Sequence, residues 1–522
     1  MIQENGTVDA FINECFNNKA PNYEISYPYG IAIVGGHFGD EGKGKFCDLI
    51  IRNLKKQGKK VINIRAQGGG NAGHTVVSST TGKEYHFHYL PSGGLISDLI
   101  LLGGGMLLDP IRIHTEASML PEEQQAKILI DGRATFCTWL ERKMDSYYEG
   151  KKTNKVGTTG SGVGPAVAYR ALRVDIRFFE AKACKNWQEL RELFLKIPDV
   201  PQKIFNEIGD AYSSFDEYVE ELYDAIQSLN IVESMPIIQK TKDEGWSLVL
   251  EVSQAFGLDS IFGNSGKFVT STHTTVAGAL ADAGLVPADI TDGTIIITKA
   301  YASKVGSGKF MTKFGTEPYS ALLSQSPMEI SDFIHEVNGE CGVTTGRKRD
   351  LGWFDCVAVR AAIQRNGSRK LAINCMDTIG KIPGNVARIC VAYEHKETHE
   401  RTVFWPDLQE DYTPVYKEIA VDWNIKHVVS ESKLPEEVWN FLGQIAYYTG
   451  ADICYIGTGG SDRDVIVFSE EYGKKKINAY AAKAEVEAMS SWLTHQIIVD
   501  NRDYPEETFE ADEDDDEKEE DL

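Results

Sequence analysis

The sequence lacks features that several large classes of protein require. Positive charge is scarce, because 54 Lys and Arg stand against 77 Asp and Glu, for a formal net charge of −23. The segment 505–522 alone holds 12 Asp and Glu and one Lys, and the rest of the chain is still acidic. Binding to nucleic acid or to an anionic membrane needs a basic face. We therefore expect neither partner.

Long apolar runs, a leader segment and paired cysteines are also missing. The most apolar stretch, 99–108, is interrupted by three glycines and is too short to cross a membrane. The first 16 residues have neither the basic start nor the continuous apolar segment of a secretion signal. The nine cysteines include no CxxC pair. We expect reduced, buried thiols in a cytoplasmic protein, not a disulfide framework or a zinc site.

What is present is the alternation of strands and helices. An apolar stripe at helical spacing runs from Phe215 to Leu229 and predicts a core-facing helix. Buried strands are predicted at 31–34, 61–64, 128–130, 248–250, 295–297, 389–391 and 453–456. This order predicts an α/β fold with a large central, mainly parallel sheet flanked by helices and carrying small subdomain insertions. Ligands then belong at the carboxyl ends of strands.

The chain divides into four parts by composition. Residues 28–475 carry the regular pattern and form the main domain. The weakly patterned residues 1–27 are an N-terminal extension, and 476–504 are a C-terminal helical or extended addition. Residues 505–522 form an acidic tail that we expect to be disordered, because it cannot bury apolar area.

A glycine-rich segment follows the first predicted strand, at 35–45. Its glycines allow backbone amides to curve around an anion, and two lysines add positive charge. Asp40 is unexpected in a simple anion site, but its carboxylate makes sense if it holds a metal or takes a proton. The segment does not fit the Walker A pattern, because Gly44 stands where Ser or Thr would follow Lys43.

Three further segments indicate anion binding. Residues 67–75 carry His74 in a turn after a strand, where a protonated imidazole can donate to a phosphoryl oxygen. Residues 156–165 combine hydroxyls with glycine amides. Residues 343–349 place two arginines beside threonines, which suits a dicarboxylate or a phosphate. Several such sites in one acidic chain imply substrates with several anionic groups.

The ordered set of motifs resembles the adenylosuccinate synthetase family over roughly residues 31–469. The matching motifs are Gly39-Asp40-Glu41-Gly42-Lys43-Gly44-Lys45, Asn71-Ala72-Gly73-His74-Thr75, Gly157-Thr158-Thr159-Gly160, Lys299-Ala300-Tyr301, Val305-Gly306, Thr344-Thr345-Gly346-Arg347 and Gly352-Trp353-Phe354-Asp355. The resemblance implies a P-loop-NTPase-like catalytic domain. It also implies a cytoplasmic, homodimeric ligase of purine biosynthesis that joins L-aspartate to IMP with GTP and Mg²⁺.

The resemblance implies a reaction in two steps. Asp40 would take the N1 proton of the purine, so that O6 attacks the γ-phosphorus of the triphosphate while His74 stabilises the transferring group. The aspartate amine would then displace phosphate from C6. Mg²⁺ would be held by Asp40, the Gly73 carbonyl and the phosphates.

The resemblance also implies three sets of binding residues. The purine nucleotide would be held by Asn71, Thr159, Gln254, Thr270 and Arg347, with Arg170 or Arg173 reaching across the dimer. The substrate aspartate would be held by Thr344, Thr345, Arg347 and Arg349. The donor would be held by Gly39, Glu41, Gly42, Lys43, Gly44, Lys45, Asn374, Asp377, Thr458, Gly459 and Gly460.

Two segments near the donor base depart from the family. The family reads guanine with Thr-Lys-Leu-Asp, and an alignment on Asp377 puts Asn374 in place of the guanine-reading Asp. Asparagine offers one acceptor and one donor, which suits adenine and favours ATP over GTP. A shifted alignment instead makes Asp377 the base reader. The late motif 457–463 has one residue more than the family's Ser-Thr-Gly-Pro-Asp-Arg.

The purine-contacting segment departs as well. Residues 251–255 read Glu-Val-Ser-Gln-Ala where the family has Glu-Gly-Ala-Gln-Gly, which leaves GMP and dGMP as alternatives to IMP. Two other classes stay open: a nucleotide phosphotransferase, and an inactive nucleotide-binding paralogue. The arginine-rich segment 343–349 argues against the first, and the presence of both Asp40 and His74 argues against the second.

Overall fold

The computed structural model describes residues 29–77, 83–153, 156–207, 212–315, 327–341, 346, 348–406 and 409–500, with the backbone alone at 75, 202, 327 and 491–500. The predicted N-terminal extension and the acidic tail lie outside the described residues. Among the described residues, no helix combines the length and the apolar character needed to span a bilayer. All eight cysteines in this part of the chain are free thiols.

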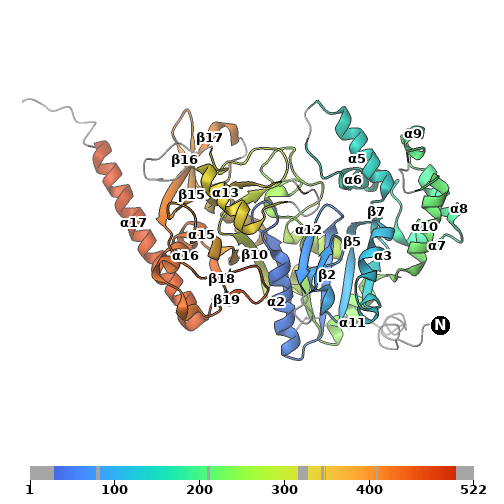
Figure 1. The fold of residues 1–522 in the computed structure, drawn as a ribbon, viewed down its shortest axis with the longest axis horizontal. Coiled ribbons are helices and arrows are strands. Elements are labelled where there is room, and N and C mark those ends of the chain that lie inside the picture. Colours follow the sequence, from blue (N-terminus) through green and yellow to red (C-terminus); the bar gives the residue numbers. More distant parts are fainter. Residues whose placement is uncertain are drawn as a thin grey trace, which may run out of the picture.

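The molecule is built on one 11-stranded sheet (Figure 1). Its order is β19-β18-β14-β10-β1-β9-β2-β5-β6-β8, with β7 paired to β5. The strands are β1 Gly30–Gly35, β2 Val61–Gly68, β5 Leu99–Leu108, β6 Ile128–Asp131, β7 Thr135–Phe136, β8 Ile231–Val232, β9 Ser247–Glu251, β10 Gly293–Lys299, β14 Lys370–Asn374, β18 Asp452–Gly457 and β19 Val465–Val467. The β18–β19 pair is antiparallel, and the other pairs are parallel, so the predicted mainly parallel sheet is confirmed.

Three small sheets accompany the large one. They consist of β3 His74–Val77 with β4 Glu84–Phe87, of β11 Ala302–Lys304 with β12 Asp350–Gly352, and of β13 Phe354–Asp355, β15 Val386–His395, β16 Arg401–Thr402 and β17 Tyr412–Ala420. Six of the seven predicted strands lie in the main sheet. The seventh, at 389–391, is part of β15, which pairs mainly antiparallel with β17 outside that sheet. The other five strands of the main sheet, β5, β7, β8, β14 and β19, were not predicted.

Helices cover the sheet and extend beyond both of its ends. They are α2 Lys43–Lys56, α3 Pro110–Ser118, α4 Glu122–Gln125, α5 Trp139–Lys151, α6 Val163–Leu172, α7 Phe178–Ala183, α8 Trp187–Leu195, α9 Gln202–Phe205, α10 Phe215–Ser228, α11 Ser234–Asp243, α12 Val276–Ala283, α13 Pro327–Asn338, α14 Cys356–Asn366, α15 Met376–Ile379, α16 Glu436–Thr449 and α17 Lys475–Asp500. The group α5–α10 gathers at the β6 end of the sheet, and α16 and α17 lie at the β18 end (Figure 1). The predicted stripe is the buried face of α10.

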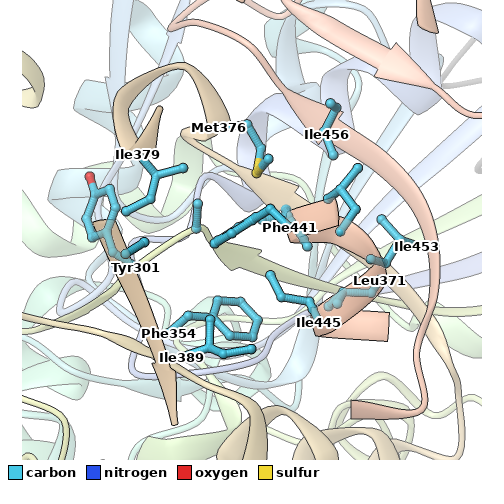
Figure 2. Packing of buried hydrophobic residues seen from close by; sticks show 14 of the residues in the cluster. Tyr301, Phe354, Leu371, Met376, Ile379, Ile389, Phe441, Ile445, Ile453 and Ile456 are labelled. Carbon is cyan, nitrogen blue, oxygen red and sulfur yellow. The ribbon is translucent and has the colours of Figure 1, made fainter. Parts of the chain in front are cut away.

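The core beside β14 and β18 fixes one side of the candidate site. Figure 2 shows Leu371 of β14 and Ile453 of β18 packed with Phe441 and Ile445 of α16. Met376, in the first turn of α15, is buried in the same cluster. Complete burial of each such side chain contributes about 1.5–3 kcal/mol. The carboxyl end of β14 and the short helix after it are therefore firmly held.

Candidate functional site

Many of the predicted site residues lie at the carboxyl ends of six adjacent strands. In the order β18, β14, β10, β1, β9 and β2, these strands are all parallel. The loops after β18 and β14 carry the donor residues, and the loops after β9 and β2 carry the purine residues. Residues 35–45, which we call the glycine loop, follow β1 between them. This order puts the residues predicted for the two nucleotides on opposite sides of one loop, an arrangement compatible with phosphoryl transfer.

The glycine loop is held in shape by Glu41. The buried Glu41 carboxylate accepts hydrogen bonds from the amides of His37 at 3.1 Å and Gly39 at 2.8 Å, and from Lys43 Nζ at 3.3 Å. Gly39 and Asp40 have φ of 98° and 58°, and a residue other than glycine in this region costs about 1–3 kcal/mol. Donor binding by Glu41 stays a prediction, and the bonds that its carboxylate makes here lie within the loop.

The start of α2 is open to an anion. Its N-cap, Gly42, has a left-handed φ of 85° and offers no side-chain cap. The first amides of the helix therefore have no side-chain acceptor at the cap, and such amides bind phosphate well. A Cβ on Gly44 would lie 2.6 Å from Ser92 Oγ and 3.9 Å from His74 Cδ2, so His74 reaches the start of this helix.

Asp40 projects from the glycine loop toward the segment that we expect to bind aspartate. Its Oδ2 accepts from Arg349 Nε at 2.8 Å, and its side chain is 33% exposed. No group of three or more His, Cys, Asp or Glu that could hold a metal occurs in the described part of the chain. A single accessible carboxylate fits Mg²⁺, which takes one or two carboxylates and completes its shell with substrate phosphates and water.

His74 lies at the start of β3, with its Nε2 buried and without a hydrogen-bond partner among the described residues. Burial lowers the pKa of His74 to about 4, against the opposing effect of the Glu251 carboxylate. The imidazole is therefore neutral in the free protein at pH 7, whereas we expected a protonated ring. A neutral ring still donates one N–H, so it can bond a phosphoryl oxygen.

Gln254 follows β9 and is another of the buried polar side chains that have no hydrogen-bond partner in the described part of the chain. Both atoms of its amide are buried and unbonded within the described residues, and its φ is 57°. The neighbouring Ser253, which stands where the family has alanine, accepts from Arg65 Nε at 3.1 Å and donates to the Gln67 carbonyl at 2.8 Å. The serine thereby ties the β9 loop to β2, while the glutamine amide stays available to a ligand.

The other predicted purine residues each make a local hydrogen bond. Asn71 Oδ1 accepts from the Gly69 amide at 3.2 Å. The Thr270 amide donates to the Leu258 carbonyl at 2.9 Å. Thr159 is exposed, and its hydroxyl donates to Ser161 Oγ at 2.9 Å.

The two candidate arginines for the dimer differ in their contacts. Arg170 Nε donates to Thr135 Oγ1 at 3.0 Å, and its guanidinium also bonds the Gly105 and Met106 carbonyls. Arg173 ends α6 in the left-handed region, at φ 63°, and is exposed. Arg170 is thus engaged within its own chain, and Arg173 remains the candidate that can reach a partner subunit.

The donor side differs, because its polar groups bond one another. Lys45 Nζ donates to the Gly459 carbonyl at 2.7 Å, the Asp464 carbonyl at 3.0 Å and Asn374 Oδ1 at 3.3 Å. Asn374 Nδ2 donates to the Glu41 carbonyl at 3.4 Å. Both ends of the Asn374 amide therefore face the glycine loop and α2.

Asp377 and the late loop complete this side. Asp377 lies in the first turn of α15 and is partly buried, and burial raises the pKa of its carboxyl, against the effects of its backbone hydrogen bond and of Lys45. Thr458 is buried, and its hydroxyl donates a hydrogen bond to the Val428 carbonyl at 2.8 Å. Gly460 has open space where a Cβ would stand.

The segment expected to bind aspartate is described in part. Thr344, Thr345 and Arg347 lie outside the described residues. Arg349 lies just before β12 and bonds both Asp40 and Glu340. Glu340 was not predicted as a site residue, because an acidic residue beside an arginine-rich segment gives no sign of which cations it meets.

Comparisons with known proteins agree with this geometry. A family model described as adenylosuccinate synthetase matches residues 32–466. The adenylosuccinate synthetase of a Geobacillus species is 32% identical over 444 residues, covering 82% of this chain and 96% of that protein. The enzyme of Caldicellulosiruptor saccharolyticus is 32% identical over 450 residues, covering 84% and 98%.

Two solved structures share the fold. The fully ligated adenylosuccinate synthetase of Plasmodium falciparum has a TM-score of 0.74 and 24% identity, covering 84% of this chain and 99% of that chain. The succinoaminodeoxyadenylate synthetase of cyanophage S-2L, bound to dGMP and dATP as an energy donor, has a TM-score of 0.51 and 17% identity, covering 87% and 99%.

Proposed function

Because the chain belongs to the adenylosuccinate synthetase family, we propose that it joins L-aspartate to C6 of IMP, with GTP as the donor, to give adenylosuccinate. One observation supports this most strongly. Among the described residues, His74 Nε2 and both Gln254 amide atoms are buried and have no hydrogen-bond partner, on the side of the glycine loop away from the donor loops. Buried polar atoms of this kind are costly unless a ligand satisfies them.

The chemistry that we assign to these residues balances in two steps. Asp40 takes the N1 proton of IMP, O6 attacks the γ-phosphorus, and the bond from that phosphorus to the β,γ-bridging oxygen breaks, which releases the nucleoside diphosphate. The N–H of His74 stabilises charge on the transferring phosphoryl group. The aspartate amine then attacks C6, loses a proton, and phosphate leaves with O6. Phosphorylation is needed because an amide oxygen is a poor leaving group.

Asp40 and the Gly73 carbonyl are the residues that we propose for Mg²⁺. The bound ion supplies neutralisation of phosphate charge. In the free protein the Asp40 carboxylate shares its charge with Arg349 instead.

The contacts of Asn374 bear on the donor. An amide that is bonded to Lys45 and to the glycine loop is poorly placed to read a base, which weakens the case for ATP. The contacts of Asn374 favour the shifted alignment, in which Asp377 reads the base. An ionised carboxylate only accepts hydrogen bonds, which matches the N1–H and 2-amino donors of guanine. We therefore propose GTP.

A matrix assay tests the function directly. IMP, GMP and dGMP are each supplied as acceptor with GTP or ATP as donor, in the presence of Mg²⁺ and aspartate, and succino-nucleotide formation is measured. We expect IMP with GTP to give the highest kcat/KM. A preference for GMP or dGMP would change the acceptor, and a preference for ATP would restore Asn374 as the base reader.

Other outcomes would overturn the ligase itself. Phosphate transfer to an acceptor with no requirement for aspartate would indicate a nucleotide phosphotransferase. Nucleotide binding without turnover in any combination would indicate an inactive paralogue.

We also propose a cytoplasmic homodimer in which Arg173 reaches the purine nucleotide of the partner subunit. Arg173→Ala and Asp40→Asn would each inactivate a homodimer. If the two variants mix at random, about half of the dimers are hybrids, and each hybrid has one intact site of its two. The mixture should therefore show about a quarter of wild-type activity. No recovery in mixtures shown to exchange subunits would rule out the trans arginine.

A further inference from the structure

Glu340 is the most heavily bonded carboxylate near the site. It is 2% exposed and follows α13 at the start of the arginine-rich segment. Its oxygens accept from Lys299 Nζ at 2.7 and 2.9 Å, from Arg349 Nη1 at 2.5 Å and from the Tyr301 hydroxyl. One buried carboxylate thus gathers two cations, one of them Lys299 at the carboxyl end of the central strand β10.

The backbone of Glu340 also joins the two ends of the arginine-rich segment. The Arg349 amide donates to the Glu340 carbonyl at 3.0 Å, and Cys341 forms a β-bridge with Lys348. The described residues on the two sides of 342–347 therefore meet at this point. The position of Arg349 is set by its bonds to Glu340 through both backbone and side chain.

Arg349 lies between two carboxylates of unequal exposure. Nη1 faces Glu340, which is 2% exposed, and Nε faces Asp40, which is 33% exposed. Burial lowers the pKa of Arg349, but the two carboxylates outweigh this effect and raise it. A carboxylate arriving from solvent meets the Asp40 side of the guanidinium first. The Glu340 side is sealed and stays bonded.

We infer that Glu340 is a positioning residue for the aspartate substrate: it anchors Arg349 from behind while the Asp40 side of the guanidinium is exchanged for the incoming carboxylate. The inference rests on the proposed function. It assigns Glu340 no contact with substrate, and its effect passes entirely through Arg349. Exchange at Arg349 also frees the Asp40 carboxylate for its own chemistry.

A purely structural role is the competing explanation. Tyr301 packs at the edge of the core cluster, and its hydroxyl points away from the apolar side chains (Figure 2). That hydroxyl also accepts from Asn338 Nδ2, which bonds Thr378 of α15. If Glu340 only holds this network together, its loss lowers stability and affects all substrates alike.

The test is Glu340→Gln, with KM measured separately for aspartate, IMP and the triphosphate. We expect the KM for aspartate to rise at least tenfold, while the other two KM values change less than threefold. Glu340→Asp keeps the charge and should recover part of the aspartate affinity. If the glutamine variant does not fold, the aspartate variant carries the test, with a smaller but equally selective rise.

A matched control comes from a remote buried ion pair. Asp289 is 4% exposed, bonds Lys242 at 2.6 Å, and lies beside Gly30 at the amino end of β1, away from the site. Asp289→Asn should lower the melting temperature and leave the KM for aspartate unchanged.

The outcomes separate the two proposals. Wild-type protein that forms no succino-nucleotide removes the proposed function and this inference together. Active wild type combined with an unchanged aspartate KM in Glu340→Gln, or with equal rises in all three KM values, overturns the inference alone.

Discussion

The two sides of the glycine loop differ in how their polar groups are satisfied. On the purine side, His74 Nε2 and the Gln254 amide are buried and have no partners in the described part of the chain. On the donor side, Lys45 donates hydrogen bonds to both Asn374 and the Asp464 carbonyl. Both sides stand on parallel strands of the same sheet. The purine side is therefore formed before its ligand arrives, whereas the donor side has to give up internal bonds.

This difference shows what residue type can and cannot reveal. An asparagine in a base-reading position is compatible with adenine on its chemistry alone. Its actual partners are Lys45, 329 residues away in the chain, and the Glu41 carbonyl. Removing a group that forms hydrogen bonds within the protein loses the stability those bonds contribute, whereas removing an unbonded group loses no hydrogen bond. Mutations on the two sides should consequently divide between stability and binding.

The largest effect on kcat is expected at Asp40, in the glycine loop between the purine side and the donor side. Asp40→Asn removes the proposed base and should lower kcat by about 10²–10⁴-fold, because proton transfer to a positioned group contributes on that scale. Binding of IMP, measured by calorimetry, should persist. Asp98→Asn, at the amino end of β5 and paired with Lys55, is the control. Activity within tenfold of wild type would remove the base assignment.

The next effect is expected on the purine side. His74→Asn should lower kcat by about 10²–10³-fold, the range for losing one donor to a developing charge. The KM for IMP should change little, because the interaction belongs to the transition state. Single-turnover measurement of triphosphate cleavage checks this. A change confined to KM would mean that His74 binds substrate without stabilising transfer.

Sequence reasoning succeeded where local pattern decides structure. Short β-branched runs predicted β1, β9 and β10 because such residues suit buried parallel strands. β5 was missed because three glycines interrupt its apolar run, although the backbone of Gly103 and Gly105 packs tightly on Ala66 and Asp282. β15 was predicted as a strand, but pairing is a tertiary property, and it joined a different sheet.

The site was predictable as a set of loops and less so as a set of contacts. The glycine loop, His74 and Gln254 were identified by motif, and they fall at adjacent strand ends. The loop-holding bonds of Glu41 were not predicted, because a carboxylate that caps its own loop looks the same in sequence as one that faces a ligand. The role of Glu340 depends on Lys299, 41 residues earlier, which no local pattern indicates.

The pH dependence of stability offers a third test. Because the pKa of His74 falls from 6.5 to about 4 on folding, the unfolded chain binds more protons between these values. Stability is then fully present above pH 6.5 and declines as the pH falls toward 4, by at most about 3 kcal/mol. His74→Asn should flatten this decline in denaturant unfolding at pH 7 and pH 4.5. The exposed His399→Asn is the control, and an unchanged slope in His74→Asn would contradict the assignment.

The smallest and most direct test compares one amide from each side. Gln254→Ala removes an amide that has no hydrogen-bond partner among the residues the structure describes, so it should raise the KM for IMP about tenfold and leave the free energy of unfolding nearly unchanged. Asn374→Ala leaves Lys45 and the Glu41 carbonyl short of a partner, so it should cost about 1–3 kcal/mol of stability. Its effect on the KM for the triphosphate should be smaller than that of Asp377→Asn. If Asn374→Ala were neutral for stability and selective for one donor base, its amide would be free in solution, and the proposed contrast between the two sides would not hold.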